Sequence, residues 1–339
     1  MREISYYDSE DNITGDSGHI DKGSAARLPA HERFQVLALD GGGGRALFTA
    51  HVLARLEADL DLKVVDSFDL IAGTSAGGII ALGLGAGMRP AQLVEHCVDL
   101  AKGTFPRFRR ARWHLLPRIW DSARFDDGSR GALIRLFGPR RFGESTKRLI
   151  IPSWDARRGE VHIFKTPHHM RLRRDGEISM VDVAMATTSA PRFLAAATAN
   201  ELQLIDGGVW ANNPSVVAIG EAVSMLGVPL EAIHVLSLGT VDQRTNHFES
   251  LTRGRSGSRS ESAETLMITA SSRGAQGTAI HLVGNENFTR FDARLPELAM
   301  DLSSSASLDR LIESHIRALR PVYTEKFAEH LASPYTPNP

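Results

Sequence analysis

A serine flanked by glycines is the first group in the sequence whose type and spacing could carry chemistry. The segment Gly73-Thr74-Ser75-Ala76-Gly77 lies between an apolar run and a stretch of small residues. At a sharp strand-to-helix turn a serine hydroxyl is held exposed in a strained conformation, and flanking glycines avoid clashes with neighbouring backbone. We therefore predict a nucleophile at Ser75 and an elbow shaped by Gly73 and Gly77. The alternative is a turn with a purely structural role.

A run of four glycines is the second candidate. Gly41 to Gly44 follow Asp40 and precede Arg45. Successive backbone N–H groups in such a loop can bind an anion. The P-loop pattern fails because no Lys-Ser or Lys-Thr follows, and the dinucleotide pattern fails because its last glycine is missing. Two interpretations remain: an oxyanion hole, which holds the charge of a tetrahedral intermediate, and a flexible turn.

A serine nucleophile needs a base within hydrogen-bond reach. Asp206 ends an apolar run and is followed by two glycines, which makes it one candidate, although an Asp-Gly pair is by default a turn. A histidine late in the chain is the other usual base. The late histidines are His234, His247, His281, His315 and His330. Apart from His247, they fit helix-surface or partly buried positions better than a catalytic loop.

The elements that must position these groups follow an α/β pattern, in which apolar runs alternate with segments of helical period. Predicted strands are 34–39, 68–72, 149–154, 161–165, 201–205 and 233–238. Predicted helices are 46–60, 78–87, 90–102, one capped by Ser179 and Asp182, and one capped by Asn213-Pro214 that ends near 226. Residues 103–145 predict short helices and loops, 241–262 a mobile polar loop, and the remainder mostly helix, with an apolar stripe over 308–319.

Composition and charge narrow the class of protein. The 339 residues carry a formal net charge of -1, are 42% hydrophobic and include one cysteine, Cys97. These values are typical of a globular protein and exclude an intramolecular disulfide framework and a cysteine-rich zinc site. The near-neutral charge argues against a partner that is a nucleic acid polymer. His168-His169 lacks further ligands at metal-binding spacing, so no metal and no other cofactor is expected.

Targeting signals are not recognisable in the sequence. No apolar run reaches the roughly 18 residues that span a bilayer, and the N-terminus lacks the apolar core of a signal peptide. A soluble, cytoplasmic protein is therefore expected. Residues 1–33 are polar and without period, which predicts a poorly ordered leader. Residues 34–330 are predicted to form one domain, and 331–339 a C-terminal tail.

The motifs taken together resemble those of the patatin-like phospholipases. They are Asp-Gly-Gly-Gly-x-Arg at 40–45, Gly-x-Ser-x-Gly at 73–77 and Asp-Gly-Gly at 206–208. Ala186-Thr187-Thr188-Ser189-Ala190-Pro191 and Leu236-Ser237-Leu238-Gly239-Thr240 look like two framework segments of the same family, so the resemblance covers roughly 34–325. One departure is Ala46, which stands where the family usually has glycine. The resemblance implies a three-layer α/β/α fold around a central, mostly parallel sheet.

The resemblance also assigns roles and an activity. Ser75 becomes the nucleophile and Asp206 the base of a Ser-Asp dyad, while Gly42, Gly43, Gly44 and Arg45 correspond to the oxyanion loop. The implied enzyme is a lipid acyl hydrolase that cleaves phospholipid esters through an acyl-enzyme. A base near the unperturbed Asp pKa of about 3.9 is weak, so a partly desolvated, largely apolar cleft is expected.

Several bacterial members of this size are antiphage effectors that a cyclic nucleotide switches on, and the compact build looks similar to theirs. The implied partners are thus a phospholipid membrane surface, contacted from the cytoplasmic side, and a cyclic-nucleotide activator; a homo-oligomer is compatible with the sequence. The alternatives are a non-catalytic patatin-fold binding protein and a Ser-His-Asp esterase. Head-group preference, the activator and its binding site, and the oligomeric state are not encoded in recognisable motifs.

A basic and aromatic segment at 101–144 is a candidate for membrane contact. It carries Lys102 and ten arginines against four acidic residues, with aromatic side chains interleaved. Such a surface suits an anionic bilayer. The competing interpretation is a cap over the active site, which is compatible with the first.

Overall fold

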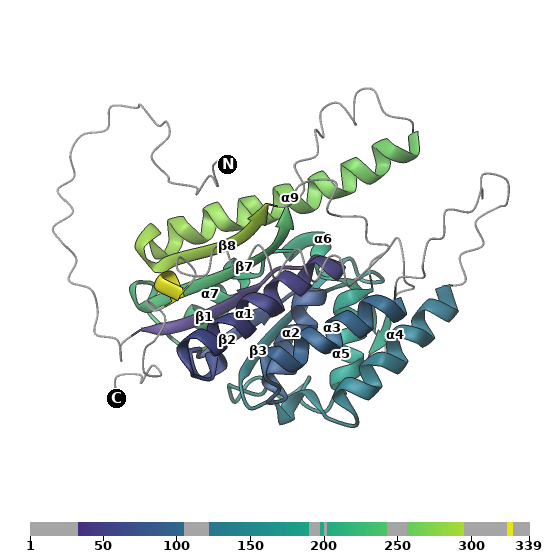
Figure 1. The fold of residues 1–339 in the computed structure, drawn as a ribbon, viewed down its shortest axis with the longest axis horizontal. Helices are drawn as coiled ribbons and strands as arrows, with labels where there is room; N and C mark the ends of the chain where they lie inside the picture. The colour runs from purple at the N-terminus through teal and green to yellow at the C-terminus, as the bar shows by residue number, and fades with distance from the viewer. Residues whose placement is uncertain are drawn as a thin grey trace.

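The computed structural model describes residues 33–104, 122–189, 197–199, 202–242, 256–294 and 324–327. Within these residues eight strands form one sheet in the order β5-β6-β3-β2-β1-β7-β8, with β4 paired to β3 (Figure 1). The strands are β1 (Phe34–Leu39), β2 (Leu70–Gly73), β3 (Arg148–Asp155), β4 (Glu160–Lys165), β5 (Ala197–Ala199), β6 (Leu202–Asp206), β7 (Ile233–Asp242) and β8 (Phe288–Arg294).

The centre of the sheet is parallel. Strand β1 pairs in parallel with β2 and β7, and β3 and β8 continue the parallel arrangement on either side. Strands β4 and β6 run antiparallel to β3, and β5 is antiparallel to β6. Because β1 and β2 are parallel, the loops that follow Leu39 and Gly73 leave the sheet at the same edge. The glycine run and the serine motif are therefore neighbours in space.

Helices cover both faces of this sheet, which confirms the predicted α/β/α layers. The helices are α1 (Leu47–Leu60), α2 (Ala76–Gly85), α3 (Pro90–Thr104), α4 (Ser122–Phe137), α5 (Met180–Thr188), α6 (Gly208–Ala211), α7 (Ser215–Ser224) and α9 (Ser256–Val283). Side chains of β1 alternate between two buried clusters. Leu37 and Leu39 join the cluster that includes α1 to α5. Val36 and Ala38 join the one formed with α7 and α9.

Local sequence signals explain two helix starts. The Ser179 hydroxyl accepts the Asp182 backbone N–H at 3.0 Å, as the predicted cap of α5 requires. The side-chain oxygen of Asn213 accepts the Ser215 N–H at 3.0 Å at the start of α7. Both helices begin within two residues of the predicted positions. These caps therefore set where the connection after β4 ends at α5 and where the one after β6 ends at α7.

The expectations for 103–145 and 241–262 were partly wrong. Helix α4 is a regular helix of 16 residues where only short helices were expected. Helix α9 begins at Ser256, inside the segment expected to be a loop, and its N-terminal part extends past the sheet (Figure 1). The first turns of α9 consist largely of polar residues, so the sequence shows no apolar period there.

Strand β8 also contradicts the sequence expectation, which was mostly helix after 262. Its segment is Phe-Thr-Arg-Phe-Asp-Ala-Arg, with Arg290 and Asp292 pointing at each other rather than an apolar alternation. Strand β7 was expected to stop at Gly239 but continues to Asp242 beside β8, with a register shift between Leu238 and Val241. Part-buried ionic partners replace apolar ones here, so periodicity does not reveal the strand.

Other expectations fall on residues that lie outside the described ranges. These are the leader up to residue 32, the arginines of 105–121, the helical stripe over 308–319 and the tail at 331–339. In the described part of the chain, no helix has the length and apolar character needed to cross a bilayer.

Candidate active site

Ser75 occupies a strained turn between β2 and α2. Its backbone angles are φ 54° and ψ -125°, a region that non-glycine residues rarely adopt. A Cβ on Gly73 would lie 2.4 Å from the Gly77 carbonyl oxygen, and one on Gly77 would lie 2.5 Å from the Leu39 carbonyl oxygen. Neither glycine has room for a larger residue unless the backbone moves. The turn thus lifts the serine hydroxyl away from the sheet.

The Ser75 hydroxyl donates to a carboxylate at the end of β6, a strand that β3 separates from β2 in the sheet. Its Oγ lies 2.7 Å from Oδ2 of Asp206, the last residue of β6. The other oxygen, Oδ1, accepts the Gly208 backbone N–H at 2.6 Å. Burial raises the pKa of Asp206 to about 6, although the hydrogen bonds from Ser75 and Gly208 lower it. The carboxylate is thus oriented by backbone and is a stronger base than an exposed aspartate.

The C-terminal end of α5 ties these two residues together. The Thr187 hydroxyl accepts the Ser75 backbone N–H at 3.0 Å and donates to the Pro152 carbonyl at 2.7 Å. Two residues on, the Ser189 carbonyl accepts the Asp206 backbone N–H at 2.9 Å. From the sequence, this segment is recognisable only as a framework match to the family, and no role is predicted for Thr187. The one sequence feature that points to Thr187 is its position near the end of a predicted helix.

The glycine run passes directly beside the serine. A Cβ on Gly41 would lie 3.2 Å from the Ser75 Cβ, and the Gly41 N–H donates to the Asn212 carbonyl at 3.0 Å. Gly43 has φ 55°, and Gly43–Ala46 forms a short 3-10 turn that contains Gly44 and Arg45 and leads into α1. The structure therefore brings the loop and the Ser75–Asp206 pair to one place. The departure at Ala46 is accommodated because its backbone is right-handed helical, with φ -65° and ψ -12°, a conformation that does not require glycine.

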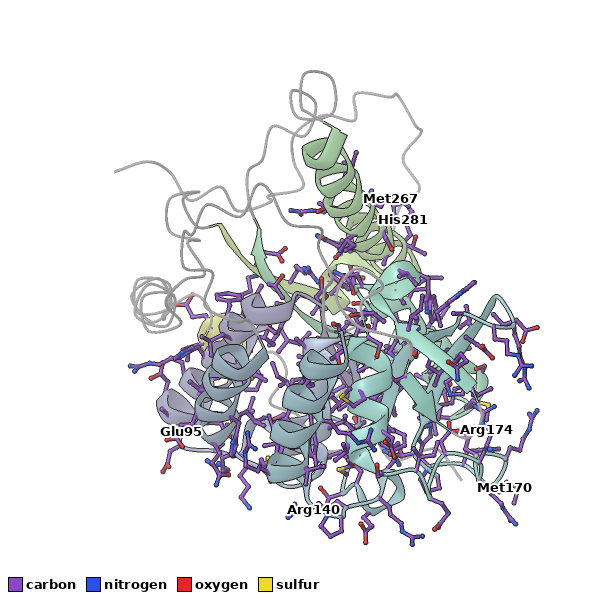
Figure 2. The ribbon with its side chains drawn as sticks, turned by 90° about the vertical axis from the view of Figure 1, so that its right-hand side faces the viewer. Glu95, Arg140, Met170, Arg174, Met267 and His281 are labelled. Atoms are coloured by element: carbon purple, nitrogen blue, oxygen red, sulfur yellow. The ribbon has the colours of Figure 1, made fainter. Side chains whose placement is uncertain are left out.

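The late histidines do not compete for this position in the described part of the chain. His281 is exposed on α9 (Figure 2), and His234 pairs with Gln35 near the beginning of β1, at the opposite end from Asp40. The remaining three candidates lie outside the described ranges. No group of three or more His, Cys, Asp or Glu side chains that could hold a metal occurs among the described residues.

A serine on a strained strand-to-helix turn, bonded to a buried aspartate beside a glycine loop, is the arrangement expected of an α/β serine hydrolase. The family comparison specifies the class further. The chain belongs to the patatin-like phospholipases, whose family model matches residues 37–219. Its members are hydrolases of the serine-hydrolase type. That match includes the glycine run, Ser75 and Asp206.

Three bacterial proteins named cGAMP-activated phospholipase are among the relatives. The chain is 35% identical over 232 residues to one from Escherichia coli (strain TW11681), covering 62% of this chain and 63% of that protein. It is 32% identical over 282 residues to one from Pseudomonas aeruginosa (strain BWHPSA011 / Pa011), covering 82% and 83%. It is 30% identical over 332 residues to one from Vibrio cholerae serotype O1 (strain ATCC 39315 / El Tor Inaba N16961), covering 88% and 92%.

Proposed function

We propose that this chain hydrolyses phospholipid esters with Ser75 as nucleophile and Asp206 as the only side-chain base. The observation that carries the proposal is the 2.7 Å hydrogen bond from the Ser75 hydroxyl to a buried carboxylate. A nucleophile and base within this distance, on a turn that exposes the hydroxyl, need no histidine between them. Family membership supports the substrate class.

In the acylation half, Asp206 accepts the Ser75 proton while Oγ attacks the ester carbonyl carbon, and the carbonyl π electrons move to its oxygen. The tetrahedral intermediate collapses, the ester C–O bond breaks, and the leaving alkoxide takes the proton from Asp206. A lysophospholipid departs and the fatty acyl group stays on Ser75.

In the deacylation half, a water gives its proton to Asp206 and attacks the acyl carbon. Collapse of the second intermediate breaks the bond to Ser75 Oγ, which takes the proton back from Asp206, and a fatty acid leaves. The raised pKa of Asp206, about 6, suits both halves, because the group is ionised at neutral pH and still basic enough to accept a proton.

Backbone donors would hold the developing oxyanion in both halves. Gly42, Gly43, Gly44 and Arg45 are the proposed oxyanion loop, since the loop runs beside Ser75 and the N–H of Gly41 is already donated to Asn212. Helix α2 begins directly after Ser75, so its positive N-terminal end faces the same charge.

We also propose that a cyclic nucleotide regulates the hydrolysis. The three relatives are named for activation by cGAMP. We infer that hydrolysis by this chain is switched on in the same way. The enzyme would then act as a membrane-degrading effector in bacterial antiphage defence, working from the cytoplasm at the inner face of the membrane.

The test is release of fatty acid from phospholipid vesicles by the purified full chain, with and without cGAMP. Ser75→Ala and Asp206→Asn should each abolish release, whereas Ser224→Ala, an exposed helical serine bonded to its own helix, should not. Activity only with cGAMP supports the regulated effector, and activity without it supports an unregulated lipase. Loss at a late histidine but not at Asp206 would favour a Ser-His-Asp esterase. Absence of hydrolysis under both conditions would favour a binding protein.

A further inference from the structure

We propose that Arg290 is a positioning residue, which fixes the candidate oxyanion loop by holding the side chain of Asp40. This inference rests on the proposed function, because it concerns the loop that would bind the oxyanion. Asp40 is the residue that joins β1 to the glycine run, and Arg290 lies on β8, 250 residues later in the chain. Neither residue contacts the Ser75–Asp206 pair in any hydrogen bond found for the described residues.

The contact between the two side chains is bidentate and joins a part-buried guanidinium to a buried carboxylate. Arg290 donates from Nη1 to Oδ1 of Asp40 at 2.8 Å and from Nη2 to Oδ2 at 2.7 Å. Ser272 of α9 adds a third hydrogen bond to Oδ2 at 2.8 Å. Asp40 is 2% exposed. A planar fork matched to a carboxylate fixes orientation as well as distance, which a single lysine contact would not do.

The arginine is itself held in place by its surroundings. It donates from Nη1 to the Ser237 hydroxyl at 2.6 Å, and from Nε and Nη2 to Asp292 at 3.1 and 3.0 Å. Asp292 can approach because residue 239 is glycine; a Cβ there would lie 1.7 Å from the Asp292 Oδ1. Burial lowers the pKa of Arg290, but the charges of Asp292 and Asp40 outweigh it and raise that pKa, so the group stays cationic.

Helix α9, which binds Asp40 through Ser272, also contacts the segment that follows Asp206. Ser271, next to Ser272 on α9, donates to the Trp210 carbonyl at 3.2 Å, and Trp210 lies in α6, four residues after Asp206. Adjacent serines of one helix thus bind the residue before the glycine run and the short helix after the aspartate. Because the loop begins at Asp40, a shift of that carboxylate would move the N–H donors relative to Ser75.

A purely structural role would give a different experimental result. A buried ion pair often contributes little net stability, and removing one partner destabilises the fold by leaving a buried charge. Such a loss lowers the unfolding temperature without changing turnover by the folded enzyme. A positioning role lowers kcat, because displaced donors act on the transition state, and leaves KM nearly unchanged.

The test is a double-mutant cycle in the full chain with Asp40→Asn, Arg290→Gln and both, assayed with p-nitrophenyl butyrate and cGAMP where cGAMP is required. Each single variant should lower kcat by about 10- to 100-fold, with KM within about threefold of the wild type. The double variant should be no worse than the worse single one, because the pair acts as a unit. The matched control is Arg89→Gln, which breaks the 2.7 Å ion pair between Arg89 and the buried carboxylate of Glu57. This variant should be less stable than the wild type but have the same kcat.

Unchanged kcat in Asp40→Asn and Arg290→Gln, or effects that multiply in the double variant, would overturn the positioning role. If either variant fails to fold by circular dichroism, Arg290→Lys and Ser272→Ala decide, since each keeps the buried charges balanced; wild-type kcat in both would also overturn it. Ser75→Ala separates this failure from failure of the proposed function. Hydrolysis that survives Ser75→Ala overturns both proposals, whereas Ser75-dependent hydrolysis with unchanged kcat in the Arg290 variants overturns only this one.

Discussion

The hydroxyl of Thr187 accepts the backbone N–H of Ser75, at 3.0 Å, from a residue that is 112 positions away in sequence. The same hydroxyl donates its proton to the Pro152 carbonyl of β3 at 2.7 Å. A turn with φ 54° at a non-glycine residue needs support from outside, because strained backbone persists only where the surroundings over-determine it. Thr187 supplies that support by linking the turn to the neighbouring strand.

Thr187→Val tests this support with a nearly isosteric change. It leaves the Ser75 N–H without its acceptor and should lower the free energy of unfolding by about 1–3 kcal/mol. It should also lower kcat on a soluble ester, since the nucleophile is no longer fixed. Thr188→Val is the matched control, because among the described residues the Thr188 hydroxyl bonds within its own helix, to Ala184 at 2.7 Å and Met185 at 3.4 Å. Equal effects of the two changes on kcat would contradict the role assigned to Thr187.

The pH dependence of hydrolysis should follow Asp206. Its pKa of about 6 belongs to the group that must be ionised to accept the Ser75 proton. We expect kcat/KM on a soluble ester to rise about tenfold per pH unit below this value and to level off above it. Initial rates between pH 4.5 and 8 measure the profile. A limb near pH 7 that disappears when one late histidine is replaced would instead identify a histidine base.

Asp206→Asn should stabilise the fold at neutral pH while it removes activity. Because burial raises the folded-state pKa from 3.8 to about 6, ionisation of Asp206 opposes folding. The stability that this group contributes is present below pH 4 and is lost as pH rises through 6, a difference of about 3 kcal/mol. Urea titrations at pH 4 and pH 8 should show the variant more stable than the wild type only at pH 8. Destabilisation at both values would show that Asn cannot replace the hydrogen bonds of the carboxylate.

Local sequence patterns were sufficient to predict most of the strands and helices. Buried strands such as 34–39 and 149–154 are apolar apart from Gln35 and Ser153, and helices such as Leu47–Leu60 show a clear period, so both were predicted within a few residues. The turn at 73–77 and the glycine run were placed correctly because each combines glycines with a strand before and a helix after. Parallel pairing of β1 and β2 then brings them together at one edge.

Long-range polar contacts were not predictable in the same way. Thr187 and Arg290 each form a hydrogen bond with a residue more than a hundred positions away. Arg290 also lies on β8, a strand without apolar alternation. Nothing in the local sequence distinguishes a threonine that accepts a distant N–H from one that caps its own helix, as Thr188 does. The first turns of α9 consist largely of polar residues, so their helical structure also left no period to detect.

Gly43→Ala should lower kcat more than it affects KM. At φ 55° an alanine is strained by about 1–2 kcal/mol, which shifts the proposed oxyanion donors. Gly138→Ala is the control, since Gly138 has φ 60°, lies at the end of α4 and has no neighbour within 4 Å of an added Cβ. Both variants should lose similar stability in urea, and only Gly43→Ala should lose turnover. Equal kcat for the two folded variants would remove Gly43 from the oxyanion loop.

The basic and aromatic segment at 101–144 is a candidate for membrane contact, and its central arginines lie outside the described ranges. If it contacts the membrane, vesicle binding should weaken with salt, because charges are screened over about 8–10 Å at physiological ionic strength. Each arginine near an anionic surface contributes about 1 kcal/mol. Changing Arg107, Arg109, Arg110 and Arg112 to Gln should therefore reduce both binding to anionic vesicles and hydrolysis of their lipids.

Hydrolysis of p-nitrophenyl butyrate separates membrane contact from a cap over the site. The soluble ester needs only Ser75, Asp206 and the glycine run, so the four changes should leave its rate nearly untouched. The control variant removes the same charge from the exposed Arg157, Arg158, Arg171 and Arg173, two in the turn after β3 and two in the loop after β4, near the labelled Met170 in Figure 2. It should bind vesicles like the wild type if the effect is local. Equal loss on vesicles and on the soluble ester would favour the cap, because a misshapen site impairs both substrates.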